Sequence, residues 1–507
     1  MKGYFSSSIE VSCLLLATGL TACGGGGSGG YMAPPTAAPV APAATAAFAQ
    51  PASATTINFG QAVTLQWSST NSTGCTAAVS AAGGGSFTGN QAMSGTATVV
   101  PTAPGTYTYT LNCTGAGGNA SVTAPMVTVS PSILSTLSTA GTITTIGSTV
   151  DPINGDQNPY GLAIAPATTG LITKGDLIVC NFNDAGTPAA QGGVQGTGTT
   201  IVGLHPVAGS KPYRIAQSAG LDGCDALTLL PDDSISAAAW SATANPLVSA
   251  AGVVSMPFAD AFAYPWGEAY VAATGTQPAA MYVSNAPGGN IAAGGTIDRI
   301  SLDDDAQTSF TEIASGFCTS GSPGMIFGPS GLTYDPSNDT LYVVDTSSAS
   351  VIAIVGISNV SKDGVVVNGQ CAGATTTPTP VPTFSGPSMT SARVIAHGAP
   401  LNTPLSAALL KNGDLLVANA DIGVQAPSAT TNLLIEVSPV VPGGFVGKPF
   451  QVDTATPGAL FGLATAVDAE GNQVIYFNDD NAAAVLQLTG TTANTTPPTP
   501  YSTPRAP

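Results

Sequence analysis

The chain has 507 residues, which is long enough for two or three domains that each bury a core. Only 7% of the residues are charged, whereas 61 glycines and 40 prolines indicate short strands joined by many turns. The sequence therefore predicts an all-β protein. With 10 basic against 28 acidic residues, the net charge of −18 would repel phosphate backbones, so we expect no nucleic acid partner.

The N-terminus contains a targeting segment. Residues 11–20 are apolar, too short to span a bilayer and of the length found in signal peptides. The sequence "LTAC" that ends at Cys23 resembles the lipobox of bacterial lipoproteins, which implies that residues 1–22 are removed and that Cys23 is lipidated. The alternative is an ordinary signal peptide with a chance cysteine, but the glycine-rich stretch directly after Cys23 favours the lipobox. The acidic Glu10 is unusual before the apolar stretch of a signal peptide. The resemblance places the chain on the cell envelope, anchored to the membrane by lipid, and Gly24 favours the outer membrane.

Residues 23–56 are poor in large apolar side chains and rich in glycine, proline and alanine. This composition predicts a disordered tether, because it can neither bury a core nor form a helix. Fully extended at about 3.1 Å per residue, the tether could reach on the order of 100 Å. It would hold the folded domains well clear of the lipid surface.

Residues 57–130 alternate apolar and polar side chains in segments such as "AVTLQWSS" and "GTYTYTLNCTG". This pattern predicts the short strands of one β-sandwich. Trp67, followed by Cys75 and Cys113, resembles the "W…C…YTLxC" pattern of bacterial immunoglobulin-like modules, although Cys75 follows the tryptophan rather than preceding it as in antibody domains. A Cys75–Cys113 bridge around roughly 38 residues would stabilise the domain by about 4 kcal/mol on the chain-entropy estimate. We expect this domain to act in spacing or display.

Six similar segments follow residue 150. The first and last end at residues 181 and 478, which gives about 59 residues per unit, as in propeller repeats with loop insertions. Each strand has an upstream partner, and Gly-Asp, Asn-Asp or Gly-Asn turns supply the positive φ of a tight hairpin. We interpret these recurring turns as structural rather than metal-binding. The six strands are "GDLIVCN", "SISAAAW", "AMYVSN", "TLYVVD", "GDLLVAN" and "QVIYFN".

The clearest unit, "GPSGLTYDPSNDTLYVVDTSSASVIAIVGI" at 328–357, resembles the NHL family of six-bladed β-propellers. The resemblance covers residues 141–490 and is loose in the second and third units. It implies an immunoglobulin-like sandwich followed by a six-bladed propeller, with 131–140 as a linker and 491–507 as a disordered tail. The last unit lacks an outer strand, and we expect the β-branched segment 141–150 to fill that place and close the ring.

The cysteines predict an oxidising compartment. Cys13 leaves with the signal peptide and Cys23 carries lipid, so six remain, an even number that fits three bridges. No Cys-x-x-Cys or Cys/His cluster suggests a metal site instead. The connectivity inside the propeller stays open; our interpretation of it pairs Cys180 with Cys224 and Cys318 with Cys371.

Catalytic motifs are sparse in this sequence. The two histidines, His205 and His397, belong to no HExxH pattern, and the chain has no Gly-x-Ser-x-Gly elbow or P-loop. Asp303 to Asp305 and Asp479 to Asp480 carry oxygen ligands, but they match no EF-hand and are expected to lie in solvated loops. We therefore assign no catalytic residue, metal or cofactor, and calcium is the one ion that stays under consideration.

A ring of polar residues at the strand ends is the candidate binding face, because these positions in propellers lie near the loops around the central channel. The five residues are Asn181, Asn285, Asp345, Asn419 and Asn478. The leading hypothesis is a monomeric, non-enzymatic module that binds or scaffolds a protein or glycan. One alternative is a calcium-dependent lactonase-like or lyase-like enzyme, because related six-bladed propellers hold a metal with Glu, Asn and Asp; Glu268 is its candidate glutamate. A purely structural envelope protein is the third reading.

Overall fold

The chain folds almost entirely into β-strands. The computed structural model of the protein describes residues 38–187, 192–257, 262–273, 277–287, 291–303, 306–319, 327–368, 380–420, 431–441, 443–490 and 499–500. Three sheets lie in residues 45–130, and six more lie in residues 142–500. None of the helices in this described part of the chain has the length and hydropathy of a membrane span.

The N-terminal domain consists of three small sheets around one core. Leu65, Trp67, Phe87, Tyr109 and Leu111 are the centre of that core, and each is at most 5% exposed. The predicted Cys75–Cys113 disulfide is confirmed and joins paired residues of two adjacent strands. The sheets are β1 (Thr45–Gln50), β3 (Val63–Thr70) and β6 (Ser94–Val99); β2 (Thr55–Asn58), β10 (Val127–Ser130) and β7 (Gly105–Tyr107); and β5 (Gly89–Gln91), β4 (Gly74–Val79), β8 (Tyr109–Thr114) and β9 (Ala120–Thr123).

The predicted start of this domain was wrong, and the predicted linker after it contains a helix. The tether was expected to run to residue 56, but β1 and β2 already belong to the sheets. The segment "TAAFAQ" has a strand pattern in spite of its alanines, and Phe48 lies 6.2 Å from Phe87 between ring centroids. The predicted linker 131–140 contains the helix α1 (Ile133–Ala140), which begins where Ser132 Oγ accepts a hydrogen bond from Ser135 N.

Helix α1 packs against the C-terminal domain rather than forming a free connection between the two domains. Its Leu134 and Leu137 pack into a core shared with the fifth and sixth sheets of that domain. The Glu436 carboxylate accepts hydrogen bonds from Ile133 N at 3.2 Å and Leu134 N at 2.7 Å, so it satisfies two amides at the helix start. The connection between the two domains is therefore an ordered contact.

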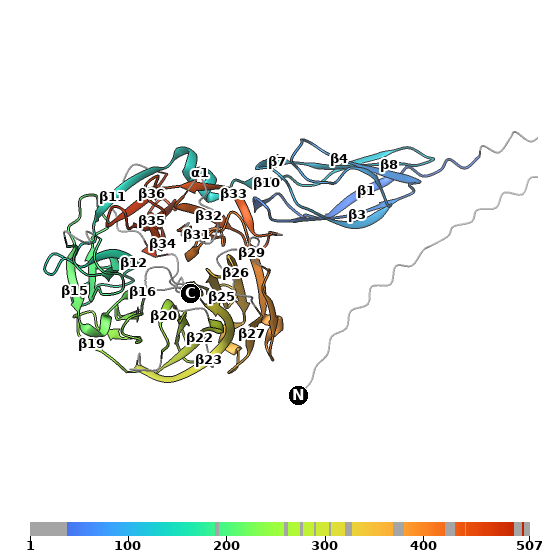
Figure 1. The fold of residues 1–507 in the computed structure, drawn as a ribbon. Coiled ribbons are helices and arrows are strands. Elements are labelled where there is room, and N and C mark those ends of the chain that lie inside the picture. The colour runs from blue at the N-terminus through green and yellow to red at the C-terminus, as the bar shows by residue number, and fades with distance from the viewer. Residues whose placement is uncertain are drawn as a thin grey trace, which may run out of the picture.

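Residues 142–500 form six sheets that follow one another around a ring (Figure 1). The first strand of each sheet contacts the first strand of the next, and β34 contacts β12, so six strands line a central channel. This ring is a β-propeller, as the repeats predict. The sheets are β12 (Gln157–Ile164), β13 (Leu177–Asn183), β14 (Thr200–Leu204) and β15 (Tyr213–Gln217); β16 (Cys224–Leu229), β17 (Ile235–Ala239), β18 (Leu247–Val248) and β19 (Val254–Ser255); β20 (Pro265–Val271), β21 (Ala280–Asn285), β22 (Ile291–Asp303), β23 (Ala306–Thr319), β27 (Val365–Asn368) and β28 (Thr383–Ser385); β24 (Pro329–Asp335), β25 (Thr340–Asp345), β26 (Ser350–Val355) and β29 (Ala392–His397); β30 (Pro404–Leu409), β31 (Leu415–Asn419), β32 (Leu433–Val437) and β33 (Phe445–Gln451); and β34 (Leu460–Val467), β35 (Gln473–Asp479), β36 (Ala484–Thr489), β11 (Thr142–Ser148) and β37 (Thr499–Pro500).

Two features of the ring were not expected from the repeats. The chain leaves the fourth sheet between β26 and β29 and adds β27 and β28 to the outside of the third sheet. Within the predicted tail, β37 pairs with the inner strand β34. Short 3-10 helices connect some strands: η1 (Ala219–Leu221), η2 (Ile357–Asn359) and η3 (Met389–Ser391).

The predicted closure of the ring is confirmed. Strand β11 pairs antiparallel with β36 from Thr142 opposite Thr489 to Ser148 opposite Ala484. The strand that comes first in the chain of this domain thus completes its last sheet. Closure joins the two ends of the domain by hydrogen bonds and covers the edge of β36.

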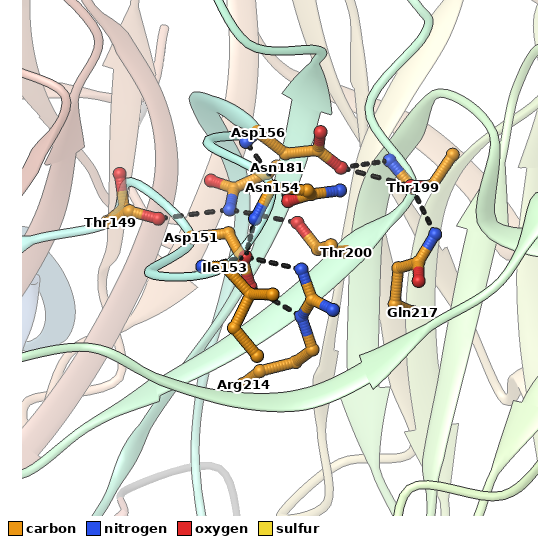
Figure 2. A network of polar contacts seen from close by, with 10 residues as sticks. All are labelled: Thr149, Asp151, Ile153, Asn154, Asp156, Asn181, Thr199, Thr200, Arg214 and Gln217. Atoms are coloured by element: carbon orange, nitrogen blue, oxygen red, sulfur yellow. Dashed lines mark hydrogen bonds and ion pairs between the residues drawn. The ribbon is translucent and has the colours of Figure 1, made fainter.

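A polar network fixes the chain where it passes from β11 into the first sheet (Figure 2). Asp151 is buried and binds the Arg214 guanidinium through both oxygens, at 2.5 and 2.9 Å. Ile153 N and Asn154 N also donate to Asp151 Oδ1. Burial alone would raise the pKa of Asp151, but the Arg214 side chain and the two amides hold the pKa below its usual value. Asn181 joins the network by donating to Thr149 O at 3.0 Å.

Glycine in the repeated motif lets neighbouring inner strands approach closely. A Cβ atom on Gly267 would lie 1.9 Å from Ser330 O, and one on Gly331 would lie 2.5 Å from Ser406 Cα. Gly161 and Gly462 face the backbone of the neighbouring sheet in the same way. The narrow channel therefore depends on residues without a side chain at these positions.

Candidate functional site

Two cavities occupy the central channel of the propeller. The larger has a volume of about 330 Å³ and is lined by residues of all six inner strands, including Leu162, Leu229 and Tyr334. The smaller has a volume of about 80 Å³ and lies near the residues at which the inner strands begin. Glu268 lines both cavities, so they share one wall.

Equivalent positions of the six inner strands form two layers. The pairing of each inner strand with its neighbour sets this equivalence. The first layer contains Tyr160, Asp225, Trp266, Ser330, Leu405 and Phe461, and the second contains Leu162, Leu227, Glu268, Leu332, Ala407 and Leu463. Each layer thus carries one carboxylate among mostly aromatic or aliphatic side chains. The two acids lie on the adjacent strands β16 and β20, and both line the smaller cavity.

Among the described residues, neither carboxylate has a hydrogen-bond partner at normal length and angle, although Ser236 and Asn245 lie near Glu268. Asp225 is 6% exposed and Glu268 is 7% exposed, and none of their four oxygens is hydrogen-bonded to the described residues. Burying a carboxyl group without a hydrogen-bond partner destabilises the folded protein by several kcal/mol, and the cost is larger if the group is ionised. Buried polar groups in native proteins are bonded in about nine cases of ten. Because both oxygens of each acid are unbonded among the described residues and both acids line one cavity, this pair is a candidate ligand site.

Burial favours the neutral, protonated form of both acids. Burial raises the pKa of Glu268 to about 8, and the nearby Ser236 and Asn245 side chains offset only part of the rise. Ser236 Oγ instead accepts a hydrogen bond from Asn245 Nδ2 at 2.8 Å. Burial also raises the pKa of Asp225 well above its usual value; the nearby backbone amides of Asp225 and Ala226 offset part of that rise, and the charge of Glu268 adds to it. Shifts of this kind cluster at functional sites.

Aromatic side chains surround the smaller cavity. Tyr160 stacks on Phe461 with 3.7 Å between ring centroids and on Phe182 with 4.3 Å, while Trp266 meets Tyr160 edge-on at 6.1 Å. Tyr160, Trp266 and Phe461 all line the cavity beside the two acids. These rings are at most 7% exposed, so their packing against one another holds them in place beside the cavity.

A disulfide positions the first of the two acids. Cys180 of β13 is bonded to Cys224, the residue before Asp225, as the sequence predicted. This link ties the start of β16 to the first sheet and so limits the movement of Asp225. Cys318 is also disulfide-bonded, but its predicted partner Cys371 lies outside the described residues, as does Cys23.

The predicted ring of polar residues does not face solvent. Asn181, Asn285, Asp345, Asn419 and Asn478 are each at most 3% exposed. Their side chains bind the protein itself: Asn478 Nδ2 donates to Tyr160 O at 2.9 Å, and Asp345 accepts from Ser348 Oγ at 2.5 Å. The ring therefore fastens loops and strands together, and in the structure it does not form an exposed binding face.

The other candidate residues are not among those that line the two channel cavities, although the charge of Asp480 acts on Tyr160, which does line the smaller one. His205 Nδ1 is 2.6 Å from Asp176 Oδ1 on the outer part of the first sheet, and His397 Nδ1 is 3.0 Å from Ser350 Oγ in the fourth. Asp304 and Asp305 lie outside the described residues. In the second acidic run, burial and the charge of Asp479 raise the pKa of Asp480 to about 7. Nowhere in the described ranges do three His, Cys, Asp or Glu side chains lie together as a metal site would need.

Comparisons with known proteins give structural resemblances at low sequence identity. No protein-family model matches the chain, and no curated protein matches it. Virginiamycin B lyase from Staphylococcus aureus is 13% identical over 69% of this chain and 99% of its own, with a TM-score of 0.38. Regucalcin, a calcium-binding protein from Agrobacterium tumefaciens, is 13% identical over 69% and 97%, with a TM-score of 0.39. A luciferin-regenerating enzyme is 11% identical over 71% and 98%, with a TM-score of 0.41. At these values we transfer no activity or ligand to this chain.

Proposed function

We propose that this chain is a lipid-anchored protein of the bacterial envelope that binds a small ligand in the channel of its propeller. The observation that carries the proposal is the pair of buried carboxylates, Asp225 and Glu268, without hydrogen-bond partners among the described residues. A ligand that donates hydrogen bonds or carries positive charge would satisfy them. Their burial favours a small molecule over the protein or glycan expected from the sequence.

The remaining parts of the proposal concern the setting of this site. The "LTAC" sequence before residue 24 supports a lipoprotein of the outer membrane, and the N-terminal sheets with their Cys75–Cys113 bridge support an immunoglobulin-like spacer. The six sheets and their hairpin repeats support a six-bladed propeller of the NHL type. We propose a monomer, since one chain closes its own ring.

A thermal unfolding screen of the full chain tests the binding function. The probes are single small molecules from five classes: amines, alcohols, carboxylates, sugars and lactones. At least one should raise the melting temperature of the wild type and fail to do so in Glu268→Gln, because a bound ligand stabilises only the folded state that holds it. Glu470→Gln, an exposed glutamate of the sixth sheet, is the matched control and should respond as the wild type does. A screen in which no compound distinguishes Glu268→Gln from the wild type would refute the proposal.

A second candidate function is acid–base catalysis of the lactonase or lyase kind. The observation in its favour is that two neighbouring carboxyl groups have raised pKa values, so one can hold a proton while the other accepts one. We propose it without calcium, because the described residues lining the cavities contribute only these two carboxylates, short of the six to eight oxygens that calcium takes. Turnover of a lactone by the wild type that is lost in Glu268→Gln would place this function first.

A further inference from the structure

We propose that the channel ligand is an organic cation, with an ammonium head in the smaller cavity and an apolar body in the larger one. This inference rests on the proposed binding function and names the ligand class. It is carried by three properties of the same site: the charge of its acids, the aromatic wall beside them, and the sizes of the two cavities.

The charge of the site favours a cation. The described residues that line the two cavities include two carboxylates and no lysine, arginine or histidine. Once ionised, Asp225 and Glu268 only accept hydrogen bonds, and the described lining holds no cation to pair with them. A bound anion would oppose that ionisation, whereas a bound cation favours it. A protonated amine brings both the positive charge and up to three donors.

The aromatic wall favours an organic cation over a metal ion. Tyr160, Trp266 and Phe461 line the smaller cavity together with both acids. Aromatic rings attract ammonium groups, and proteins hold alkylated amines in aromatic cages. Tyr160 is stacked between Phe182 and Phe461. We therefore assign this role to Trp266 and Phe461. A divalent metal needs several oxygen ligands instead, and no third metal-binding side chain joins these two among the described residues.

The cavity sizes favour a ligand with two unequal parts. The smaller cavity of about 80 Å³ holds a head group of a few heavy atoms. The larger one, of about 330 Å³, is lined mainly by leucine, isoleucine and alanine, with a few threonines and Tyr334. Because Glu268 lines both, an amine held by this acid can extend its carbon chain into the larger cavity. Apolar contacts there would add to the affinity.

Calorimetry with matched six-carbon probes tests this inference on the full chain. The probes are hexylamine, which is protonated at neutral pH, hexanol and hexanoate. Wild-type protein should bind hexylamine at least about tenfold more tightly than hexanol and should not bind hexanoate measurably. Glu268→Gln and Asp225→Asn should each weaken hexylamine binding about tenfold or more, while Glu470→Gln should bind it as the wild type does.

A proton measurement serves as the second readout if a variant does not fold. An ammonium group favours the ionised acid, so hexylamine binding should release protons from Glu268, and from Asp225, whose pKa the charge of Glu268 raises. The heat of binding should then change with the ionisation enthalpy of the buffer. Equal binding of hexanol and hexylamine, or binding without proton release, would overturn the cation inference. If hexanol bound and Glu268→Gln abolished that binding, the proposed binding function would stand and the cation inference would fail. If none of the compounds bound, both the binding function and the cation inference would fail.

Discussion

Removing the cationic partner of Asp151 should destabilise the propeller strongly. The Asp151 side chain is 0% exposed and Arg214 is 18% exposed, so Arg214→Met leaves a carboxylate buried without its counter-charge. Breaking a buried pair from one side costs about 3–5 kcal/mol. Two amides, Ile153 N and Asn154 N, would still donate to Asp151, so we expect a loss of about 3 kcal/mol, at the lower end of that range.

The reverse change should cost less. Asp151→Asn leaves Arg214, whose partial exposure lets water solvate the guanidinium, so the expected loss is about 1–2 kcal/mol. Because the folded protein lowers the pKa of Asp151, the pair contributes fully above the usual aspartate value of about 3.9 and is lost as the pH falls through the lower folded value. The gap between wild type and Arg214→Met should therefore shrink as the pH falls from 7 toward 3.

Urea unfolding measures these losses in a Trp67→Phe background. That background leaves Trp240 and Trp266, both in the propeller, as the fluorescent probes, because the chain has three tryptophans. A loss below about 0.5 kcal/mol for Arg214→Met, or a larger loss for Asp151→Asn than for Arg214→Met, would refute the reasoning about this network.

Three further predictions test the fold and the polar ring. Deleting β11 should lower the melting temperature of the whole propeller in one cooperative step, since the last sheet loses its outer strand; fraying of one end alone would contradict this. Gly331→Val should cost at least about 2 kcal/mol in urea unfolding, because its Cβ would meet the backbone of the neighbouring sheet, whereas Gly192→Ala, where nothing lies within 4 Å, should cost little. Asn285→Ala and Asp345→Ala should each cost about 1 kcal/mol, with no effect of calcium on melting in either variant; a calcium-induced rise in the wild type that both changes erase would show a metal in the ring.

The repeats predicted the ring because each unit contains in its own sequence everything that forms its hairpin. A hairpin needs an apolar strand, a turn with positive φ and a second strand, and all three are contiguous in "GPSGLTYDPSNDTLYVVD". Closure by β11 was also predictable, since the last unit visibly lacks a strand. The excursion that adds β27 and β28 to the third sheet was not, because it depends on a surface formed by a different unit.

The sequence predicted one of the two channel acids as a candidate and missed the other. Glu268 was a candidate because it is the glutamate beside the entry of a predicted strand, near the start of the third unit. Asp225 was missed, although aligning "GCDALTLLP" with "NPYGLAIAP" puts it at the position of Tyr160. An alignment does not show that the two acids share one cavity without hydrogen-bond partners among the described residues. That arrangement depends on how adjacent sheets pack.

The sequence could not decide between the two roles of the polar ring. Asn and Asp at strand ends are equally suited to binding a ligand and to fastening a loop, and the sequence does not show which oxygen faces solvent. Asn478 binds the backbone of Tyr160, 318 residues away in the chain. Such a contact exists only once the ring has closed.

The most direct test of the central claim is the stability of ligand-free wild type and Glu268→Gln in urea at pH 5 and pH 8. The pKa of Glu268 in the folded protein is about 8, above the usual glutamate value of about 4.3, so the folded state keeps a proton that the unfolded chain releases. Wild-type stability should therefore fall as the pH rises from 5 to 8, by at most about 1.4 kcal/mol per pH unit from this group. Glu268→Gln should lack that loss and be at least as stable as the wild type at pH 8. If Glu268→Gln were less stable than the wild type by more than about 1 kcal/mol at pH 8, Glu268 would be a structural group and the account of a ligand site would be wrong.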